Sequence, residues 1–548
     1  MPTLADDIRR NASGTGAALS FEDRSWTHAE VVAEAAARAA FLADRLAPGQ
    51  QHVGALLENT PEAVFWLQGA ALAGVTLVGL NSTRRGAELA RDITHTDCQL
   101  VLLDDANAPL VDADVPVPVV AVGDGTPSDT DALAAYRGAP VPDRAIPDDV
   151  PAVLIFTSGT TSAPKAAIRR GGSLRAIADK IVQDRGIGPD DVIYASMPWF
   201  HSNAIYISIA PAIVAGATLV LRRRFSASGF LEDVRRYGVT GFNYVGKPLE
   251  YILATPIRDD DSDNTLRYGM GNEANEKDIA AFSARFGVEI FDGFGSTEGG
   301  LVIYRTPDMP RGSLGRAPDD AVIVVDPATG VECPRARFDE EGRLLNADEA
   351  TGELVNSAGS ASFEGYYNND EATRERLRDG RYWSGDLGYK DAAGFVYFAG
   401  RGYDWLRVDG ENFAAAPIER ILLRHPDLAE AAVFAVPDQH VGDQVFAAVQ
   451  LRGGATFDPQ AFDAFLAGQR DLGTQQAPRF VRVMAKMPMS HTNKIQKRAL
   501  RAEGWDVGDP VWWRAQRGAP LRLLTLDDRR SLHADVAARG RGAVIGSR

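Results

Sequence analysis

The chain has 548 residues, 74 acidic and 58 basic side chains, and a formal net charge of −16. A chain of this length is too long to fold around one hydrophobic core, so more than one domain is expected. The negative charge argues against nonspecific nucleic-acid binding, which needs a basic surface. Two cysteines, Cys98 and Cys333, exclude a disulfide framework and a cysteine zinc site, and they favour a reducing compartment.

The N-terminal segment lacks the cationic start and apolar run of a secretory signal. Residues 64–80 are apolar enough to be considered as a membrane span, but they contain three glycines. Pro61 suits a first helical position and Gly74 suits a helix end, so a helix followed by a buried strand fits better. We therefore expect a cytoplasmic protein, and leave open whether it touches a membrane surface.

Hydrophobic periodicity and capping signals predict helices that alternate with short apolar strands. A capping box at Thr27 and Glu30 precedes the first expected helix. The expected helices span 28–46, 61–73, 86–95, 173–183, 418–425 and 527–538. The expected strands span 53–57, 75–80, 99–103, 119–122, 152–156, 192–196, 217–226, 242–246, 288–291, 429–436, 445–451 and 479–484. This alternation predicts an α/β fold with layered, largely parallel strands.

A polar turn follows the strand at 152–156 and precedes Lys165. Its members are Thr157, Ser158, Gly159, Thr160 and Thr161. Hydroxyls, backbone N–H groups and one cation are what the β- and γ-phosphates of a nucleotide require. The common phosphate loop G-x-x-x-x-G-K-[ST] is not met, because Pro164 and Ala166 occupy two of its places. An ordinary polar turn is the competing interpretation.

A second glycine-rich string, residues 291–300, follows the strand expected at 288–291. Glycines such as Gly293 let backbone and ligand approach closely. Phe294 can stack on a base and Thr297 can donate to a phosphate oxygen. Glu298 can hold magnesium, which typically binds through one or two carboxylates plus substrate phosphates. A turn alone would not need an aromatic, a hydroxyl and a carboxylate at this spacing.

Other polar residues stand at the ends of expected strands, where α/β proteins place ligands. His201 follows the strand at 192–196 and is either a gate beside a substrate carboxylate or a satisfied polar turn residue. Gly271, Asn272 and Glu273 could present backbone to a flat adenine ring. The G-x-G-x-x-G pattern is incomplete here, so no dinucleotide fingerprint is claimed.

The strings at 157–165 and 291–300 resemble the phosphate loop and the aromatic-Gly-x-Thr-Glu motif of the adenylate-forming superfamily. That superfamily includes acyl-CoA synthetases, luciferases and peptide-synthetase adenylation domains. Ser162 stands where the family usually has glycine, and Phe294 where tyrosine is commoner. The strings at 224–230 and 509–513 are similar to the fatty-acid transport protein and very-long-chain acyl-CoA synthetase branch.

The resemblance covers residues 20–515 and implies a two-domain organisation. The large layered domain with mainly parallel sheets would span residues 1–400 and bind ATP and the acid. A hinge at 401–404 would lead to a small, mobile α+β domain at 405–515. The tail at 516–548 matches nothing in the resemblance.

The same resemblance assigns roles to single residues. ATP or AMP would be bound by the phosphate turn, Lys165, Gly271, Asn272, Glu273, Gly293, Phe294, Asp386 and Arg401. Thr297, Glu298 and His201 would act in catalysis with Lys494. Lys497 competes with Lys494, because Asn493 replaces the customary glycine. Gly410 would face the coenzyme A side. The acid pocket would be lined by His201, Tyr244, Gly246, Gly299 and Gly300.

The implied reaction converts an apolar carboxylic acid and ATP to an acyl-adenylate with release of pyrophosphate, and then to the coenzyme A thioester with release of AMP, with Mg²⁺ as cofactor. The acid is a long or very-long-chain fatty acid, or a sterol or bile-acid side chain. Two alternatives remain open: a ligase that passes the acyl-adenylate to a carrier protein, and a lipid-uptake protein without catalysis. A monomer and a homodimer are both compatible with the sequence.

Overall fold

The computed structural model describes most of the chain. The described residues are 2–49, 51–82, 84, 86–111, 115–123, 131–147, 149–157, 165–246, 248–272, 274, 276–306, 308–318, 320–340, 344–359, 363–401, 405–408, 411–437, 443–469, 472–473, 475–489, 495–516 and 518–537. They form two compact units. The first comprises residues 1–302 and 359–382, and the second comprises residues 303–358 and 383–548.

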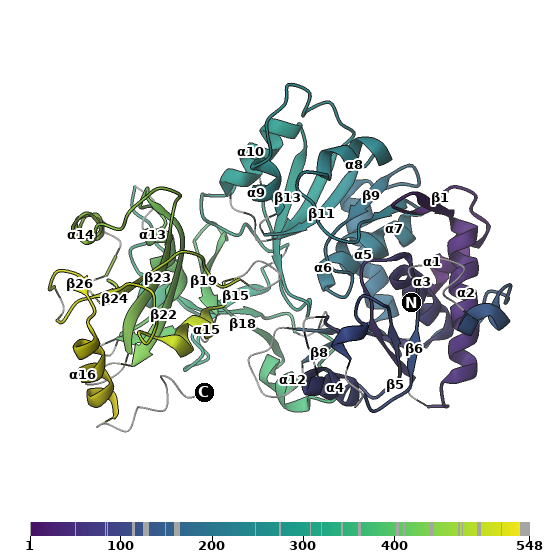
Figure 1. The fold of residues 1–548 in the computed structure, drawn as a ribbon, viewed down its shortest axis with the longest axis horizontal. Helices are drawn as coiled ribbons and strands as arrows, with labels where there is room; N and C mark the ends of the chain where they lie inside the picture. Colours follow the sequence, from purple (N-terminus) through teal and green to yellow (C-terminus); the bar gives the residue numbers. More distant parts are fainter. Residues whose placement is uncertain are drawn as a thin grey trace. The chain divides into compact units, whose positions relative to one another are not determined.

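One sheet of the first unit carries the phosphate-loop string at its edge. Its order is β6-β5-β3-β4-β7-β8, and all neighbours are parallel except β7 and β8. The strands are β3 (His52–Leu56), β4 (Thr76–Gly79), β5 (Cys98–Leu103), β6 (Val119–Ala121), β7 (Pro151–Phe156) and β8 (Ala166–Arg170). The string at 157–165 therefore connects two antiparallel strands, with β5, β6 and β8 labelled in Figure 1.

Seven strands of the other sheet run in the order β13-β12-β11-β9-β10-β1-β2. Its strands are β1 (Ala17–Phe21), β2 (Arg24–Thr27), β9 (Val192–Ala195), β10 (Thr218–Leu221), β11 (Gly241–Val245), β12 (Tyr268–Asn272) and β13 (Glu289–Gly295). Only the β1–β2 pair is antiparallel among the pairs of this run. The parallel pairing places the ends of β9, β11, β12 and β13 at one edge, where the predicted site residues follow.

Helices cover these sheets, as Figure 1 shows for α8, α9 and α10 beside β11 and β13. They are α1 (Leu4–Arg10), α2 (His28–Arg45), α3 (Pro61–Ala73), α4 (Gly86–His95), α5 (Gly171–Arg185), α7 (Ala210–Ala215), α8 (Phe230–Tyr237), α9 (Pro248–Leu253), α10 (Glu276–Phe286) and α12 (Asp370–Arg376). The capping box at Thr27 starts α2, and Gly74 ends α3 with φ +62°. Within the described residues, no helix combines the length and the apolarity needed to cross a membrane.

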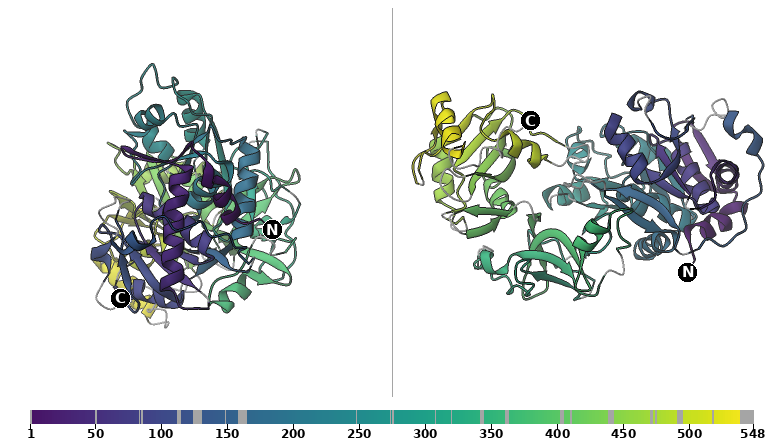
Figure 2. Two further views of the ribbon diagram at one scale, coloured as in Figure 1. Left: turned by 90° about the vertical axis from the view of Figure 1, so that its right-hand side faces the viewer. Right: turned by 90° about the horizontal axis from the view of Figure 1, so that it is seen from below.

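The second unit has two main sheets of its own (Figure 2). The strands β15 (Val322–Val325), β16 (Gly352–Asn356), β18 (Arg381–Lys390) and β19 (Val396–Arg401) follow one another in the first. The second has the order β22-β23-β24-β25-β26, with β22 (Leu428–Pro437), β23 (Asp443–Leu451), β24 (Phe480–Met484), β25 (Val511–Trp513) and β26 (Arg522–Leu523). Its helices include α13 (Ala415–Leu422), α14 (Pro459–Ala467), α15 (Lys497–Glu503) and α16 (Leu526–Ala537).

Three of the predicted elements differ from the structure by three or more residues at an end, and the other predicted bounds agree within two residues. The glycine string after residue 291 is not a turn at first, because β13 continues to Gly295, past the end of its register with β12 at Asp292. The strand expected at 217–226 ends at Leu221, and Arg222 and Arg223 leave it for ion pairs with acidic side chains. The helix expected at 418–425 spans Ala415–Leu422.

Candidate active site

The two ends of the phosphate-loop string are held together by backbone pairing. The N–H of Thr157 donates to the carbonyl of Lys165 at 2.9 Å, which closes the β7–β8 connection. The four predicted phosphate ligands Ser158, Gly159, Thr160 and Thr161 lie outside the described residues. Lys165 is described, and its side chain is buried. This burial places a cation at the point where β8 begins.

Lys165 and Glu298 meet at the side chain of Tyr366. The Lys165 ammonium lies 5.7 Å from the centre of the Tyr366 ring, and the Tyr366 hydroxyl donates to Glu298 Oε1 at 2.6 Å. Burial raises the pKa of Tyr366, and the negative charge of Glu298 raises it further, so the hydroxyl keeps the proton that it donates. Glu375 lies 3.7 Å from the Lys165 ammonium. The structure thus brings Lys165 and Glu298, which are 133 positions apart in the sequence, to the same tyrosine side chain.

Tyr366 was not predicted as a site residue. It stands in the string Gly365-Tyr366-Tyr367, which carries no charge and has no obvious ligand chemistry of its own. Its contact with the site is made by the hydroxyl of a buried ring, which reaches a carboxylate from a distant segment. A tyrosine in a polar loop of the sequence gives no signal of that contact.

Thr297 contacts the segment that follows His201. Its hydroxyl lies 3.0 Å from the hydroxyl of Ser202, and its backbone carbonyl accepts hydrogen bonds from Tyr206 and Arg169. His201 is the residue before the short helix α6 (Ser202–Ala204), and its ring centre lies 4.6 Å from that of Phe200. The predicted gate and the predicted Thr-Glu motif are therefore neighbours through Ser202.

The ends of β11 and β12 are tied to the same segment by an amide. Asn203 donates to the carbonyl of Tyr244 at 3.0 Å and to the side-chain oxygen of Asn272 at 3.2 Å. The N–H of Gly246 donates to the carbonyl of Asn272 at 2.8 Å. Three residues of the predicted nucleotide and acid pockets thus share one strand edge. Glu273, predicted beside them, lies outside the described residues.

Tyr244 and two glycines show how this edge is packed. The Tyr244 ring is buried in the core, and its hydroxyl donates to Asp292 at 2.9 Å. The group that Tyr244 offers at the strand edge is its backbone carbonyl, which accepts from Asn203. A methyl group on Gly271 would lie 2.2 Å from the Tyr244 carbonyl oxygen. A methyl group on Gly300 would lie 2.4 Å from the Tyr382 ring, so the missing side chain makes room for Tyr382. Gly299 has φ +66°, and Gly293 and Phe294 lie in β13.

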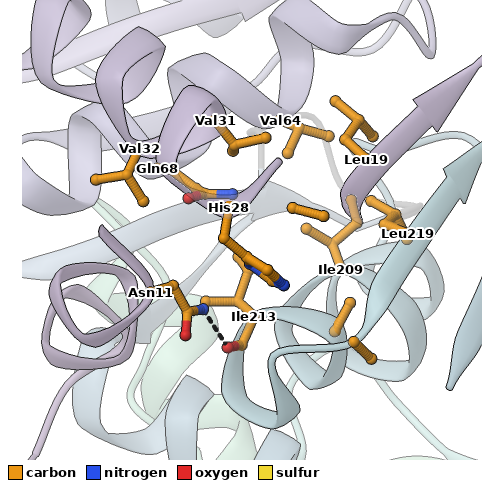
Figure 3. A pocket seen from close by; sticks show the side chains of 13 residues that line it. Asn11, Leu19, His28, Val31, Val32, Val64, Gln68, Ile209, Ile213 and Leu219 are labelled. Atoms are coloured by element: carbon orange, nitrogen blue, oxygen red, sulfur yellow. Dashed lines mark hydrogen bonds between the residues drawn. The ribbon is translucent and has the colours of Figure 1, made fainter. Parts of the chain in front are cut away.

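A cavity of about 20 Å³ in the first unit is lined by the residues shown in Figure 3. It has room for one water molecule and none for an acyl chain. Asn11 donates to the carbonyl of Ile213 at 2.9 Å beside it, and burial lowers the pKa of His28 in its wall. Its lining includes none of the residues predicted for the acid pocket.

In the second unit, two of the residues predicted to bind ATP or AMP are cross-strand partners. Asp386 on β18 pairs in register with Arg401 on β19. Gly410 and Lys494 lie outside the described residues. Lys497, the competing lysine, forms an ion pair with Glu419 at 2.8 Å, and the same oxygen of Glu419 accepts from the N–H of Val433 at 2.6 Å. Lys497 is therefore engaged in the packing of its own unit.

Comparison with known families defines the class of this fold and site. The model of the AMP-binding enzyme family matches residues 8–367, and that of the AMP-binding enzyme C-terminal domain matches residues 417–494. The chain therefore belongs to the AMP-binding enzyme family. Within that family it is an acid–thiol ligase, an AMP-forming acyl-CoA synthetase that uses ATP and coenzyme A as substrates.

Similar proteins support this class. The steroid-22-oyl-CoA synthetase of Rhodococcus jostii (strain RHA1) is 48% identical over 525 residues, which are 95% of this chain and 94% of that protein. The medium/long-chain-fatty-acid–CoA ligase FadD17 of Mycobacterium marinum is 50% identical over 497 residues, 90% of this chain and 95% of its own. The crystal structure of ATP-bound MatB from Rhodopseudomonas palustris aligns with a TM-score of 0.78 at 25% identity, covering 91% of this chain and 98% of that one.

Proposed function

We propose that the chain activates an apolar carboxylic acid, either a medium- or long-chain fatty acid or the side-chain carboxylate of a steroid, in the cytoplasm. Relatives named for both kinds of acid support this choice. The acid attacks the α-phosphorus of ATP and releases pyrophosphate, and the thiol of coenzyme A then displaces AMP from the acyl carbon. The observation that carries the proposal is that Lys165 and Glu298 both contact the buried side chain of Tyr366.

The first step brings a carboxylate onto a polyanion, which like-charge repulsion opposes in a dry site. Preorganised cations lower that barrier, because they need no reorganisation during the reaction. We assign the neutralisation of the leaving pyrophosphate to Lys165. We assign the attacking carboxylate and the bridging oxygen to Lys494. The ion pair of Lys497 with Glu419 supports Lys494 over its competitor.

The residues around Glu298 fit a magnesium ion. Tyr366 occupies Oε1 of the buried carboxylate, so Oε2 is the oxygen offered to a cation, with the hydroxyl of Thr297 on the preceding residue. Among the described residues, no three His, Cys, Asp or Glu side chains gather into a metal cage. One carboxylate plus substrate phosphates is the usual magnesium environment. When bound, the ion would reduce the negative charge of the phosphates.

We propose the domain division 1–400, 401–404 and 405–515, with a small domain that supplies Lys494 to the first step and the Gly410 face to the second. The separate match of residues 417–494 to a C-terminal domain supports a boundary before residue 417. Lys494→Ala should slow adenylate formation at least a hundredfold and leave thioester formation from preformed acyl-adenylate within a few-fold of wild type. An equal loss in both half-reactions would contradict this assignment.

The acid is tested with a panel of fatty acids and steroid side-chain acids, incubated with ATP, Mg²⁺ and coenzyme A. AMP and thioester are measured by mass spectrometry. We expect both products in equal amounts with at least one apolar acid. AMP without thioester, together with transfer to an acyl carrier protein, would identify a carrier-loading ligase instead. Binding of an acid without any AMP would identify a non-catalytic lipid-binding protein.

A further inference from the structure

Arg169 is a buried cation at the end of β8 that none of the motifs contains. Its side chain is 1% exposed. Its Nε donates to the Tyr206 hydroxyl at 3.1 Å and one terminal nitrogen donates to the Thr297 carbonyl at 3.0 Å. Its other terminal nitrogen lies 3.7 Å from a carboxylate oxygen of Glu364. An arginine has five N–H donors in a planar fork, so one side chain can bind three acceptors at once.

Tyr206 completes a closed set of hydrogen bonds around the Thr297 carbonyl. The Tyr206 hydroxyl accepts from Arg169 and donates to the Thr297 carbonyl at 3.1 Å. Both lone pairs of that carbonyl are thereby used. Burial raises the pKa of Tyr206, so the hydroxyl keeps its proton. Tyr206 lies in the π-helical turn Ile205–Ile209, a rare geometry that occurs often at functional sites.

The Thr297 carbonyl belongs to the same peptide group as the nitrogen of Glu298. Arg169 and Tyr206 therefore hold the backbone on one side of Glu298, while Tyr366 holds its carboxylate on the other. A buried charge is unfavourable unless it is paired. If this position only had to fill space in the core, an apolar side chain of similar volume would be sufficient. The contacts of Arg169 point to the orientation of Glu298 rather than to core filling.

We propose that Arg169 is a positioning residue, which orients Glu298 toward magnesium and the phosphates through the Thr297 carbonyl. This inference rests on the proposed function, because it takes Glu298 as the metal ligand. Residues that orient metal ligands typically change metal affinity or activity 10- to 100-fold when they are replaced. The effect of Arg169 should therefore appear in the magnesium dependence of nucleotide binding.

Arg170 supplies a matched control on the neighbouring position. It pairs with the same carboxylate, Glu364, at 3.2 Å, and its side chain is 38% exposed. The contacts to Thr297 and Tyr206 come from Arg169. Arg169→Met and Arg170→Met thus each remove one cation from Glu364, but only the first removes a donor from the Thr297 carbonyl.

The experiment measures the dissociation constant of ATP by calorimetry, in magnesium and in EDTA, for the full-length protein and its variants. In Arg169→Met, the ratio of the ATP dissociation constant in EDTA to that in magnesium should be lower than in wild type by about tenfold or more. Arg169→Lys, which keeps the charge without the fork, should fall between this variant and wild type. Arg170→Met should stay within threefold of wild type. Equal losses in Arg169→Met and Arg170→Met would overturn the inference.

If Arg169→Met does not fold, Tyr206→Phe tests the same set of hydrogen bonds at the Thr297 carbonyl. This substitution removes one buried hydroxyl, and we expect it to weaken magnesium-dependent binding several-fold and to lower the melting temperature, while unfolding stays cooperative. Wild-type binding in Tyr206→Phe would overturn the inference. Acid-dependent pyrophosphate exchange is measured in parallel, where kcat should fall and the KM for the acid should not change. A wild-type enzyme that shows no exchange with any acid would contradict the proposed function, while the calorimetric comparison still tests Arg169.

Discussion

Hydrogen bonds fix both the side chain of Glu298 and the residue before it. Glu298 is buried, it accepts a short hydrogen bond from Tyr366, and the residue before it is held through both its hydroxyl and its carbonyl. A buried carboxylate is costly without partners, and hydrogen bonds to it reduce that cost. The site thus places the carboxylate of Glu298 and the ammonium of Lys165 against the same buried tyrosine.

Glu298→Gln should lower the rate of acid-dependent pyrophosphate exchange by about a hundredfold or more, because the charge is lost while an oxygen acceptor for Tyr366 is kept. The exchange rate is measured over a range of magnesium concentrations. Glu375→Gln is the matched control, since Glu375 is a mostly exposed partner of Lys165, and it should change the rate less than threefold. Comparable rates for Glu298→Gln and wild type would remove Glu298 from the mechanism.

Asp92 on α4 carries a pH-dependent part of the stability. Burial raises its pKa from 3.8 to about 6, although Arg84 lies 2.9 Å away and lowers it. No hydrogen bond from the described residues reaches either carboxylate oxygen. A carboxyl whose pKa is raised by folding binds its proton more tightly in the folded state. Its contribution is present below about pH 4 and is lost as the pH rises through about 6.

Asp92→Asn should therefore remove a decline in stability between pH 4 and pH 6.5 that amounts to at most about 3 kcal/mol. The melting temperatures of wild type and variant are compared across this range, and the difference between them isolates Asp92 from other titrating groups. We expect the variant to gain relative to wild type as the pH rises. A difference that does not vary with pH would show that the side chain is not titrating there.

At the scale of elements, the site depends on how closely β11 and β12 approach at their ends. The register pairs Tyr244 with Gly271 and Val245 with Asn272. Because Gly271 has no side chain, the carbonyl of Tyr244 occupies the space where a methyl group would be. The strand ends can then present Asn272 and Gly246 together to the segment after His201.

Gly271→Ala should destabilise the protein by roughly 1–3 kcal/mol and weaken ATP binding, because overpacking moves the strand backbone. Melting temperature and ATP affinity are measured together. Gly188→Ala is the control, since a methyl group there meets none of the described atoms within 4 Å and should change stability by less than about 0.5 kcal/mol. Equal stability of Gly271→Ala and wild type would contradict the packing at this edge.

At the scale of the whole molecule, each unit has cores of its own. In the second unit, Phe434, Phe446 and Phe480 stack in sequence, and Phe480 also stacks on Trp505 and Trp513. Residues 516–537 complete this core, because Leu524 and Leu532 are buried in it. The tail that matched nothing in the sequence resemblance is therefore part of the fold of this unit over its described residues.

Leu532→Ala should lower the stability of the second unit by about 2–5 kcal/mol, because it leaves a cavity against the aromatic core. Unfolding is followed by tryptophan fluorescence, which reports on Trp505 and Trp513 among others. Leu526→Ala on the same helix is the control, since Leu526 is 72% exposed, and it should change stability by less than about 0.5 kcal/mol. Two variants with the same unfolding curve would show that α16 does not contribute to the core.

Much of the fold could be predicted because the local signals agree with the tertiary structure. The capping box of α2, the Pro61 start and Gly74 end of α3 and the apolar strands of both sheets depend on neighbours in sequence. The path of β13 could not be predicted, because its glycines favour a turn, yet β13 continues to Gly295, beyond its register with β12, which ends at Asp292. The pairing of β1 with β10 likewise depends on a distant partner, and β8, which was not predicted, pairs with the preceding strand β7.

The sequence by itself determined the class of chemistry, since hydroxyls, a lysine, an aromatic and a carboxylate at fixed spacings suffice to predict a nucleotide site. Only the tertiary structure decided how these groups meet. Tyr366 joins Lys165 to Glu298, Arg169 reaches Thr297, and Tyr382 takes the space beside Gly300. The physical reason is that a motif consists of residues close together in the sequence. Burial and hydrogen bonding between distant segments arise only when the sheets and their loops pack together.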